Sequence, residues 1–204
     1  MKHPLTAENI LRQISSKDIK LGELRNIAKE IKKDHQLANE LWSSTYFFAR
    51  QLAILIMDKK LLTEDVIDSL VSDISQYQDK EKLQLIDWLI ANQLTKDKKT
   101  LALTERWKDS QSSLKRRVYW YYQGRQRWMG QTPPTSNGEL LSEIEKHIEK
   151  EVPEVQWTMN FSADWIGVYD KKYRERCMAL GEKIGLYKGK MYQKDVHRNI
   201  YLSS

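Results

Sequence analysis

Basic and aromatic side chains alternate along Ser113–Trp128, and this mixture is the clearest pattern in the chain that could do chemistry. Arginine and lysine can neutralise phosphates, and tyrosine or tryptophan can stack on a sugar or a base. A later segment repeats the combination in Tyr173, Arg174 and Arg176. Together the two segments predict a nucleic-acid-binding surface. For any single residue the alternative stays open that the aromatic rings pack inward while the basic side chains extend to solvent.

The distribution of charge supports the same prediction. The chain has a net charge of +6, from 34 basic and 28 acidic residues. Residues 95–130 hold ten basic and three acidic residues, and residues 171–198 hold nine and three, so the rest of the chain is net acidic. Such an asymmetry indicates a polyanionic partner. Solvated helix faces beside an acidic neighbour would give the same pattern.

Several classes of enzyme lack their signatures in this chain. There is no GxxxxGK[ST] loop, no GxGxxG and no HExxH, and the four histidines are scattered. The single cysteine, Cys177, excludes an internal disulfide and a cysteine-based zinc cluster. We therefore expect no metal and no cofactor, and we expect Cys177 to be a buried structural residue rather than a nucleophile.

The terminal and apolar segments indicate neither export nor a membrane span. Met1–Thr6 contains Lys2 and Pro4 and is not followed by an apolar run, so no signal peptide is predicted. The longest apolar stretch, Leu52–Met57, is far too short to cross a bilayer. We expect a cytoplasmic protein that forms a single domain over 1–204, with a monomer favoured.

The elements that must position these residues are helices, because apolar residues recur at helical spacing almost throughout. Helices are predicted at about 6–15, 21–31, 35–58, 63–75, 83–94, 101–107, 114–129, 139–149, 153–166 and 169–184. Residues 130–138 are predicted to be a loop, Gly185 a helix C-cap, and 187–204 an irregular basic tail. About ten helices in successive antiparallel pairs predict an all-α fold, a HEAT-like α-solenoid with a right-handed superhelix. A compact helical bundle is the alternative.

Three stretches carry a resemblance to a known family. They are Leu41–Asp58, which contains LWSSTYFFARQLA, then Arg106–Val118, which contains RWKDSQSSLKRRV, and Val155–Gly167, which contains VQWTMNFSADWIG. In order and spacing they resemble the AlkD-like DNA alkylation repair family, whose members are HEAT-like helical glycosylases. The resemblance covers most of Leu41–Gly185.

The resemblance implies a site made of four residues. The family's catalytic Trp and the Asp four residues after it match Trp88 and Asn92, the catalytic Arg matches Arg117, with Arg116 next, and the late aromatic residue matches Phe161. Asn92 departs from the pattern, because an amide cannot stabilise the positive charge that builds on the sugar. Loss of one such electrostatic partner costs about 3–4 kcal/mol, a factor of 100 to 1,000 in rate.

The resemblance also implies a function, which is to bind damaged duplex DNA and to excise cationic alkylated purines such as 3-methyladenine or 7-methylguanine. The residues expected to contact DNA are Arg116, Arg125, Arg127, Trp157, Lys171, Lys172, Arg174 and Arg176. Two alternatives use the same scaffold. One is a nucleic-acid binder without chemistry, which the Asn92 departure favours, and the other is a protein-interaction solenoid that holds an acidic peptide.

Overall fold

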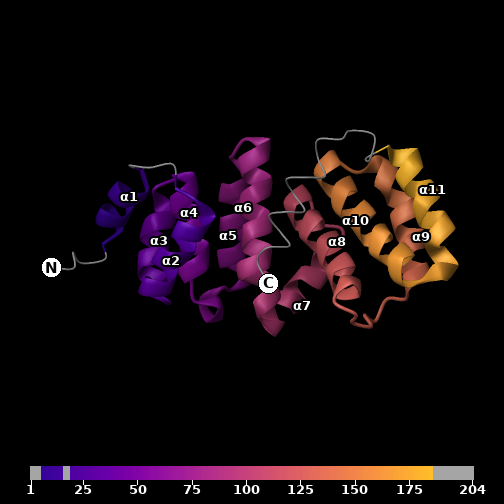
Figure 1. Cartoon of the computed structure of the whole chain (residues 1–204), viewed down its shortest axis with the longest axis horizontal. Coiled ribbons are helices and arrows are strands. Elements are labelled where there is room, and N and C mark those ends of the chain that lie inside the picture. Colours follow the sequence, from indigo (N-terminus) through magenta and orange to yellow (C-terminus); the bar gives the residue numbers. More distant parts are fainter. Residues whose placement is uncertain (1–5, 16–18, 186–204) are drawn as a thin grey trace. The chain divides into compact units, whose positions relative to one another are not determined.

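The computed structural model describes residues 6–15 and 19–185, and in these residues it contains eleven α-helices, five short 3₁₀ helices and no strand. The all-α prediction is therefore confirmed for the described part of the chain. The chain divides into two compact units, Met1–Leu103 and Thr104–Ser204, and each is described by itself (Figure 1). The prediction of a single domain is not tested by this division. The tail predicted at 187–204 lies outside the described residues.

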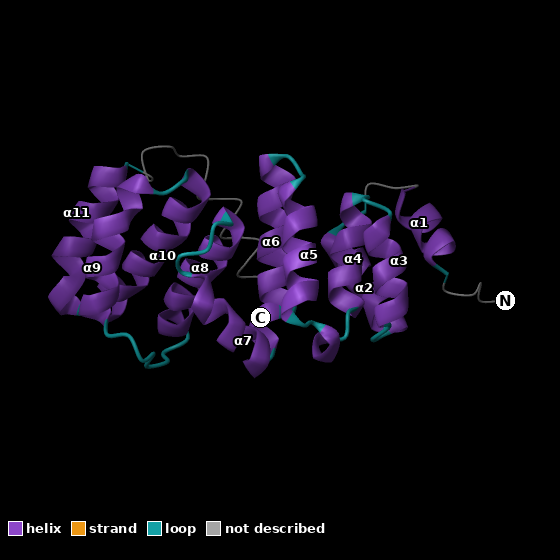
Figure 2. Ribbon diagram, turned by 180° about the vertical axis from the view of Figure 1, so that it is seen from behind, coloured by secondary structure: helices purple, strands orange, loops and turns teal. Residues whose placement is uncertain are grey.

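The first unit contains seven helices, of which α2 to α6 stand side by side (Figure 2). They are α1 (Ala7–Ser15), α2 (Leu21–Ile31), α3 (His35–Ser43), α4 (Phe47–Ile56), α5 (Glu64–Ser75), α6 (Asp79–Asn92) and α7 (Lys98–Thr104), whose last residue is the first of the second unit. Their apolar faces form the core, in which Leu24, Leu41, Ile54, Ile67 and Ile86 are fully buried.

Helices α4 and α6 run in the same direction. The indole Nε1 of Trp88 donates to the carbonyl of Gln51 at 3.0 Å, and five residues later the amide of Gln93 donates to the carbonyls of Ile54 and Met57. Contacts that advance together along both helices require parallel axes. Parallel neighbours of this kind are what a stack of helix pairs produces.

The prediction of one long helix over 35–58 is wrong, because the chain turns between α3 and α4. Thr45 adopts a left-handed conformation with a φ of 59°, which stops the helix. The hydroxyls of Ser43 and Ser44 donate to carbonyls of the preceding turn, each at 2.7 Å, and thereby compete with continuation of the helix. The guanidinium Nε of Arg50 donates to the carbonyl of Trp42 at 3.0 Å and so supplies a hydrogen-bond donor to a carbonyl in the last turn of α3.

The second unit contains the 3₁₀ helix η3 (Glu105–Trp107) and four long helices. They are α8 (Ser113–Trp128), α9 (Asn137–His147), α10 (Pro153–Tyr169) and α11 (Arg174–Ile184). Figures 1 and 2 show α10 between α8 and the pair α9 and α11. A core of buried side chains joins these helices, and its members are Trp120, Leu140, Leu141, Ile144, Ile148, Val155, Met159, Ala163, Ile166, Cys177 and Leu180.

The helix ends of the second unit follow local capping chemistry. Ser136 and Glu139 form a capping box, so α9 begins two residues before the predicted position. The prediction that the last helix begins at Tyr169 is wrong, because the extended Asp170 separates α10 from the 3₁₀ helix η5 (Lys171–Tyr173). Gly185 adopts a left-handed φ of 69° and is the C-cap of α11, as predicted.

Helices α8 and α10 lie unusually close together. Their side chains meet from Arg117 beside Glu154 to Trp128 beside Tyr169, so these two helices are also parallel. At the closest approach, a Cβ added to Gly124 would lie 2.7 Å from the Phe161 ring. Glycine at this position therefore sets how near the two helices come, and it brings the aromatic residues of both into contact. No helix among the described residues is long and apolar enough to cross a membrane.

Candidate nucleic-acid interface

Trp88 and Asn92 lie one turn apart on α6, in the first unit. Trp88 is 8% exposed, and its indole N–H is engaged by the carbonyl of Gln51. The Asn92 amide donates back to the carbonyl of Trp88 at 2.8 Å. The predicted i, i+4 pair therefore shares one side of the helix. Within the described residues, both side chains bond to main-chain carbonyls.

The sequence did not identify Arg25, which also belongs to this group. Its guanidinium carbon lies 5.1 Å from the centroid of the Trp88 ring. Beside it, the side-chain oxygen of Gln51 is buried without a hydrogen-bond partner in the described part of the chain. The cationic Arg25 thus lies over the Trp88 ring, and the residue one turn after Trp88, Asn92, is uncharged. Arg25 follows a leucine on an ordinary amphipathic helix, so no pattern in the sequence marks it.

In the second unit, three residues that the resemblance nominates form one stack. The guanidinium carbon of Arg117 lies 5.1 Å from the centroid of the Trp157 ring. Trp157 stacks on Phe161 at 5.7 Å with an interplanar angle of 10°, and Phe161 stacks on Tyr121 at 5.2 Å with an angle of 15°. Arg117 and Phe161 are buried, whereas Trp157 is half-buried and presents part of its ring to solvent.

The stack continues toward the C-terminal ends of both helices. Trp165 meets Phe161 edge-on at 6.2 Å, lies against Trp128 at 6.0 Å and stacks on Tyr169 at 5.7 Å. We call the whole set the aromatic ladder. It consists of Arg117, Tyr121, Arg125 and Trp128 on α8, with Trp157, Phe161, Trp165 and Tyr169 on α10. The four α10 residues recur every four positions, so this spacing in the sequence could have revealed the row.

Trp157 and Phe161 of the ladder lie on the side of α10 that faces away from the core. Val155, Met159 and Ile166 point into the core of the second unit. Each residue of a helix turns the side chain by about 100°, so Trp157 and Phe161 point roughly opposite to that core. The side of α10 that carries the row is thus held by α8 and by the close approach at Gly124 rather than by α9 and α11.

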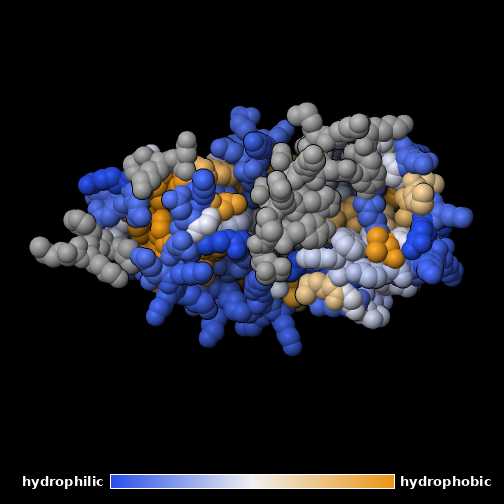
Figure 3. Space-filling model, viewed as in Figure 1, coloured by the Kyte–Doolittle hydropathy of each residue, from blue (hydrophilic) through white to orange (hydrophobic). Residues whose placement is uncertain are grey.

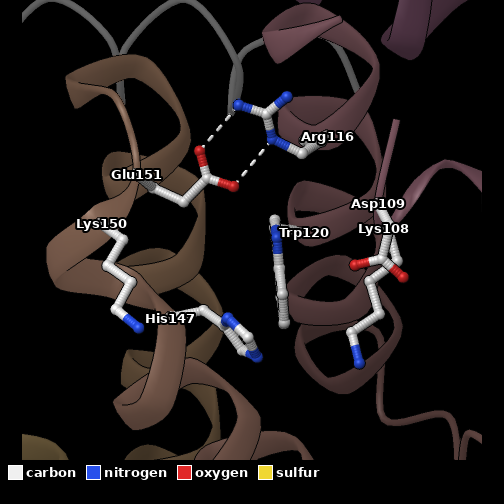
Figure 4. Close-up of a pocket in the computed structure, with 7 residues that line it drawn as sticks. All are labelled: Lys108, Asp109, Arg116, Trp120, His147, Lys150 and Glu151. Carbon is white, nitrogen blue, oxygen red and sulfur yellow. Dashed lines mark hydrogen bonds and ion pairs between the residues drawn. The ribbon is translucent and has the colours of Figure 1, made fainter. Parts of the chain in front are cut away.

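Arg116 is held by a carboxylate in a pocket of about 190 Å³ (Figure 4). Its Nε and Nη2 donate to the two oxygens of Glu151 at 2.7 and 2.9 Å, and its Nη1 donates to the carbonyl of Ser110 at 2.6 Å. The hydrogen bonds with Glu151 raise the pKa of Arg116. Lys108, in the same pocket, bonds to Glu143 at 2.6 Å. These contacts join α8 and the loop before it to α9 and to the residues that follow α9. The DNA contact of Arg116 stays a prediction.

Three more of the predicted DNA-binding arginines have internal partners. Arg127 is 5% exposed and bonds to Asn137 and to two main-chain carbonyls, and burial lowers its pKa. Arg174 donates to the carbonyls that end α10. Arg176 pairs with Glu145 at 2.6 Å. All three hold elements of the second unit together.

The remaining predicted cations are differently placed. Arg125 lies over the Trp128 ring at 5.4 Å, and Lys172 lies over the Tyr173 ring at 5.2 Å. Lys171 and Lys172 are exposed and follow α10 after Asp170. Among the described residues none of these three cations forms an ion pair with a carboxylate. Of the predicted set they are therefore the best placed to meet phosphates.

Comparison with known proteins identifies relatives of this chain. The family model described as DNA alkylation repair enzyme matches residues 10–171. A solved structure with a TM-score of 0.63 and 19% identity covers 87% of this chain and 76% of its own, and it is described as one of a new family of proteins related to the HEAT-like repeat DNA glycosylases with affinity for branched DNA structures. This likeness confirms the predicted HEAT-like fold. No curated protein matches the chain.

Proposed function

Because the chain belongs to the DNA alkylation repair enzyme family, we propose that it is a DNA-binding protein that grips duplex DNA. The observation that carries the proposal is the stack of Arg117, Trp157 and Phe161. These residues were nominated separately by the resemblance, and they come from two helices about 40 positions apart in the sequence. An arginine held against a tryptophan ring that itself stacks on a second ring is an arrangement that suits a deoxyribose and its phosphate.

The cations that meet the duplex are Arg125, Lys171 and Lys172. They lie beside the aromatic ladder and have no carboxylate partner among the described residues. Each contact with a phosphate releases condensed counterions, so affinity falls steeply with salt. The half-buried ring of Trp157 lies along the backbone of the bound DNA.

Excision of cationic alkylated purines is the candidate reaction on this scaffold. Water adds to C1′ of the deoxyribose, the C1′–N bond breaks, and its electron pair neutralises the departing purine, while the proton of the water goes to solvent. The chain's part in the second unit is to hold the sugar against Arg117 and Phe161. In the first unit, Asn92 supplies no negative charge where the family pattern has a carboxylate, and Arg25 places a positive charge over Trp88. This balance favours binding over rapid excision.

The first experiment measures the affinity for a plain duplex between about 50 and 200 mM salt. We expect a steep linear fall of log K with log salt. The double variant Lys171→Gln/Lys172→Gln should reduce the slope by about 2, since each phosphate contact contributes about 0.9. The matched control is Lys146→Gln/Lys150→Gln, which removes two exposed lysines elsewhere in the unit. An affinity that barely changes with salt would contradict the proposal.

The second experiment measures release of methylated purines from a methylated duplex. Release by the wild type, lost in Arg117→Ala, would support excision without a carboxylate at position 92. Release only by Asn92→Asp would support a binding protein on a scaffold that has lost its chemistry. Release by neither, together with DNA binding, would leave binding as the function. Without DNA binding, the interaction solenoid would take its place.

A further inference from the structure

The aromatic ladder is most open to solvent at the C-terminal ends of α8 and α10. Arg117, Tyr121 and Phe161 are 3%, 4% and 6% exposed, whereas Tyr169 is 58% exposed. Trp128 and Trp165 are intermediate. We call Trp128, Trp165 and Tyr169 the ladder end. Three aromatic rings that meet at a surface, rather than in the core, are unusual unless they have a partner.

The rings of the ladder end are held in place. Trp165 stacks on Tyr169 with an interplanar angle of 21° and lies against Trp128 at 36°. The hydroxyl of Tyr169 donates to the carbonyl of Trp128 at 3.3 Å and ties the last turn of α10 to α8. The rings therefore form a nearly parallel pair with a third beside it, already ordered before any ligand arrives. Ordering in advance reduces the entropy lost on binding.

Positive charge borders the ladder end. Arg125 lies over Trp128, and Lys171 and Lys172 begin two residues after Tyr169. The nearby carboxylate of Asp170 accepts hydrogen bonds from the main-chain N–H of Lys172 at 3.2 Å and from Asn137 at 3.1 Å, so local bonds occupy it. Flat apolar rings with cations at their rim match a nucleobase that is attached to phosphates.

The surroundings of the rings add apolar area. Met129 and Val168, each next in sequence to a ring of the ladder end, are 54% and 55% exposed. Figure 3 shows a pale area of intermediate hydropathy over α8 and the neighbouring part of α10, bordered by blue hydrophilic surface. Exposed apolar side chains therefore adjoin the rings of the ladder end in the sequence.

We propose that the ladder end stacks on a DNA base that lacks a stacking neighbour, so the chain prefers DNA that has unpaired bases or branches to a continuous duplex. Both faces of a base are covered inside a duplex, whereas a fork or branch point leaves one face open to Tyr169. The proposal rests on the proposed function, since DNA must be bound at all. It assigns the choice of DNA structure to the ladder end, in the second unit.

The test compares a forked duplex with a fully paired duplex of the same length, each with 2-aminopurine at the same position. That position is the first unpaired base of the fork. We expect the wild type to bind the fork about 5- to 100-fold more tightly, as stacking of one base allows. The fluorescence of 2-aminopurine in the fork should fall when the wild type binds, because stacking on an aromatic ring quenches it. Tyr169→Ala should remove both effects, so that this variant binds the fork and the paired duplex with equal affinity.

Two variants serve as controls. Tyr169→Phe keeps the ring and should keep the preference for the fork. Met178→Ala removes another exposed apolar side chain, 61% exposed on α11, and should change nothing. Thermal unfolding of each variant verifies that the fold is retained. A loss in Tyr169→Ala that Tyr169→Phe rescues would assign the effect to the ring itself.

Four results would overturn the proposal. Equal affinity of the wild type for both DNAs would contradict it while leaving the proposed function intact. A preference that survives in Tyr169→Ala would place the recognition elsewhere. A dimer that Tyr169→Ala converts to a monomer, with no change in affinity for the fork, would make the ladder end an interface between copies. Absence of binding to either DNA would overturn the proposed function as well.

Discussion

Arg117 and Trp157 form a cation–π pair that fixes the plane of the guanidinium. Its carbon lies 5.1 Å from the ring centroid, and its Nη1 donates to the carbonyl of Glu154, on the same helix as Trp157, at 2.7 Å. The arginine is therefore oriented by α10 although it belongs to α8. Because Arg117 is 3% exposed, its removal must affect stability as well as any contact with DNA.

We predict that Arg117→Ala lowers the free energy of unfolding by about 2–4 kcal/mol, from the lost charged hydrogen bond and the lost stacking. Arg117→Lys keeps the charge but not the planar fork, and it should recover less than half of the loss. Urea unfolding measures both. A loss below about 0.5 kcal/mol in Arg117→Ala would show that the pair contributes nothing to the fold. The base-release assay of this variant must be run well below its unfolding temperature.

Gly124 sets the distance between α8 and α10. An added Cβ would lie 2.7 Å from Cδ1 of Phe161 and 2.8 Å from the hydroxyl oxygen of Ser162. We predict that Gly124→Ala lowers the free energy of unfolding by about 1–3 kcal/mol, because overpacking outweighs the better helix propensity of alanine. It should also disturb the stack of Tyr121 on Phe161.

The matched control for this prediction is Gly22→Ala. Gly22 is also helical, but an added Cβ there meets nothing within 4 Å. This change should be neutral or should stabilise by up to about 1 kcal/mol. Differential scanning calorimetry of both variants gives the comparison. Equal changes in the free energy of unfolding for Gly22→Ala and Gly124→Ala would mean that α8 and α10 can move apart without loss of stability.

The helices were predictable because their signals are local. Thr63 at the start of α5, Pro153 at the start of α10 and Gly185 after α11 act within a few residues of themselves. The break at Thr45 was missed, because the apolar run around it looks continuous. The left-handed Thr45 is held by its own N–H, which donates to the carbonyl of Trp42 at 3.4 Å, and by the hydroxyl of Tyr77, which donates to the carbonyl of Thr45.

The site was only partly predictable. The aromatic residues of α8 were found by composition, and Trp157 and Phe161 of α10 were found through the family resemblance. The order of the rings in the ladder depends on which helix lies beside which. The hydrogen-bond and ion-pair partners of the arginines could not be predicted from the sequence. Glu151, which engages Arg116, lies 35 residues further along the chain, and the acceptors of Arg127 are mostly main-chain carbonyls. Partners this distant leave no mark in local spacing.

The ion pair of Arg116 and Glu151 yields a separate prediction. Both side chains are less than one-fifth exposed and meet through two parallel hydrogen bonds. Glu151→Gln and Arg116→Gln should each lower the free energy of unfolding by about 1–3 kcal/mol. A double-mutant cycle should return a coupling of about 1–2 kcal/mol. A coupling near zero would mean that the pair is too well solvated to contribute. The affinity of Arg116→Gln for duplex DNA tests whether the residue also contacts phosphate.

Cys177 supplies a prediction about pH. The thiol is 5% exposed and packs against Gly167, and burial, with Asp164 and Glu145 nearby, raises its pKa to about 11. An unfolded cysteine ionises near pH 8.5. The folded chain therefore keeps the proton where the unfolded chain has lost it. The resulting stabilisation is complete below about pH 8.5 and is lost as the pH rises toward 11.

We therefore expect the free energy of unfolding to fall between pH 7.5 and 10 by about 1–2 kcal/mol more in the wild type than in Cys177→Ala, which has no thiol to titrate. Comparing the two proteins at each pH cancels the lysines and tyrosines that titrate in the same range. Cys177→Ala also loses packing against Gly167, but that loss is the same at both pH values. If the two proteins lose stability in parallel, the thiol is solvated in the folded chain, and Cys177 is accessible to alkylating reagents at pH 8.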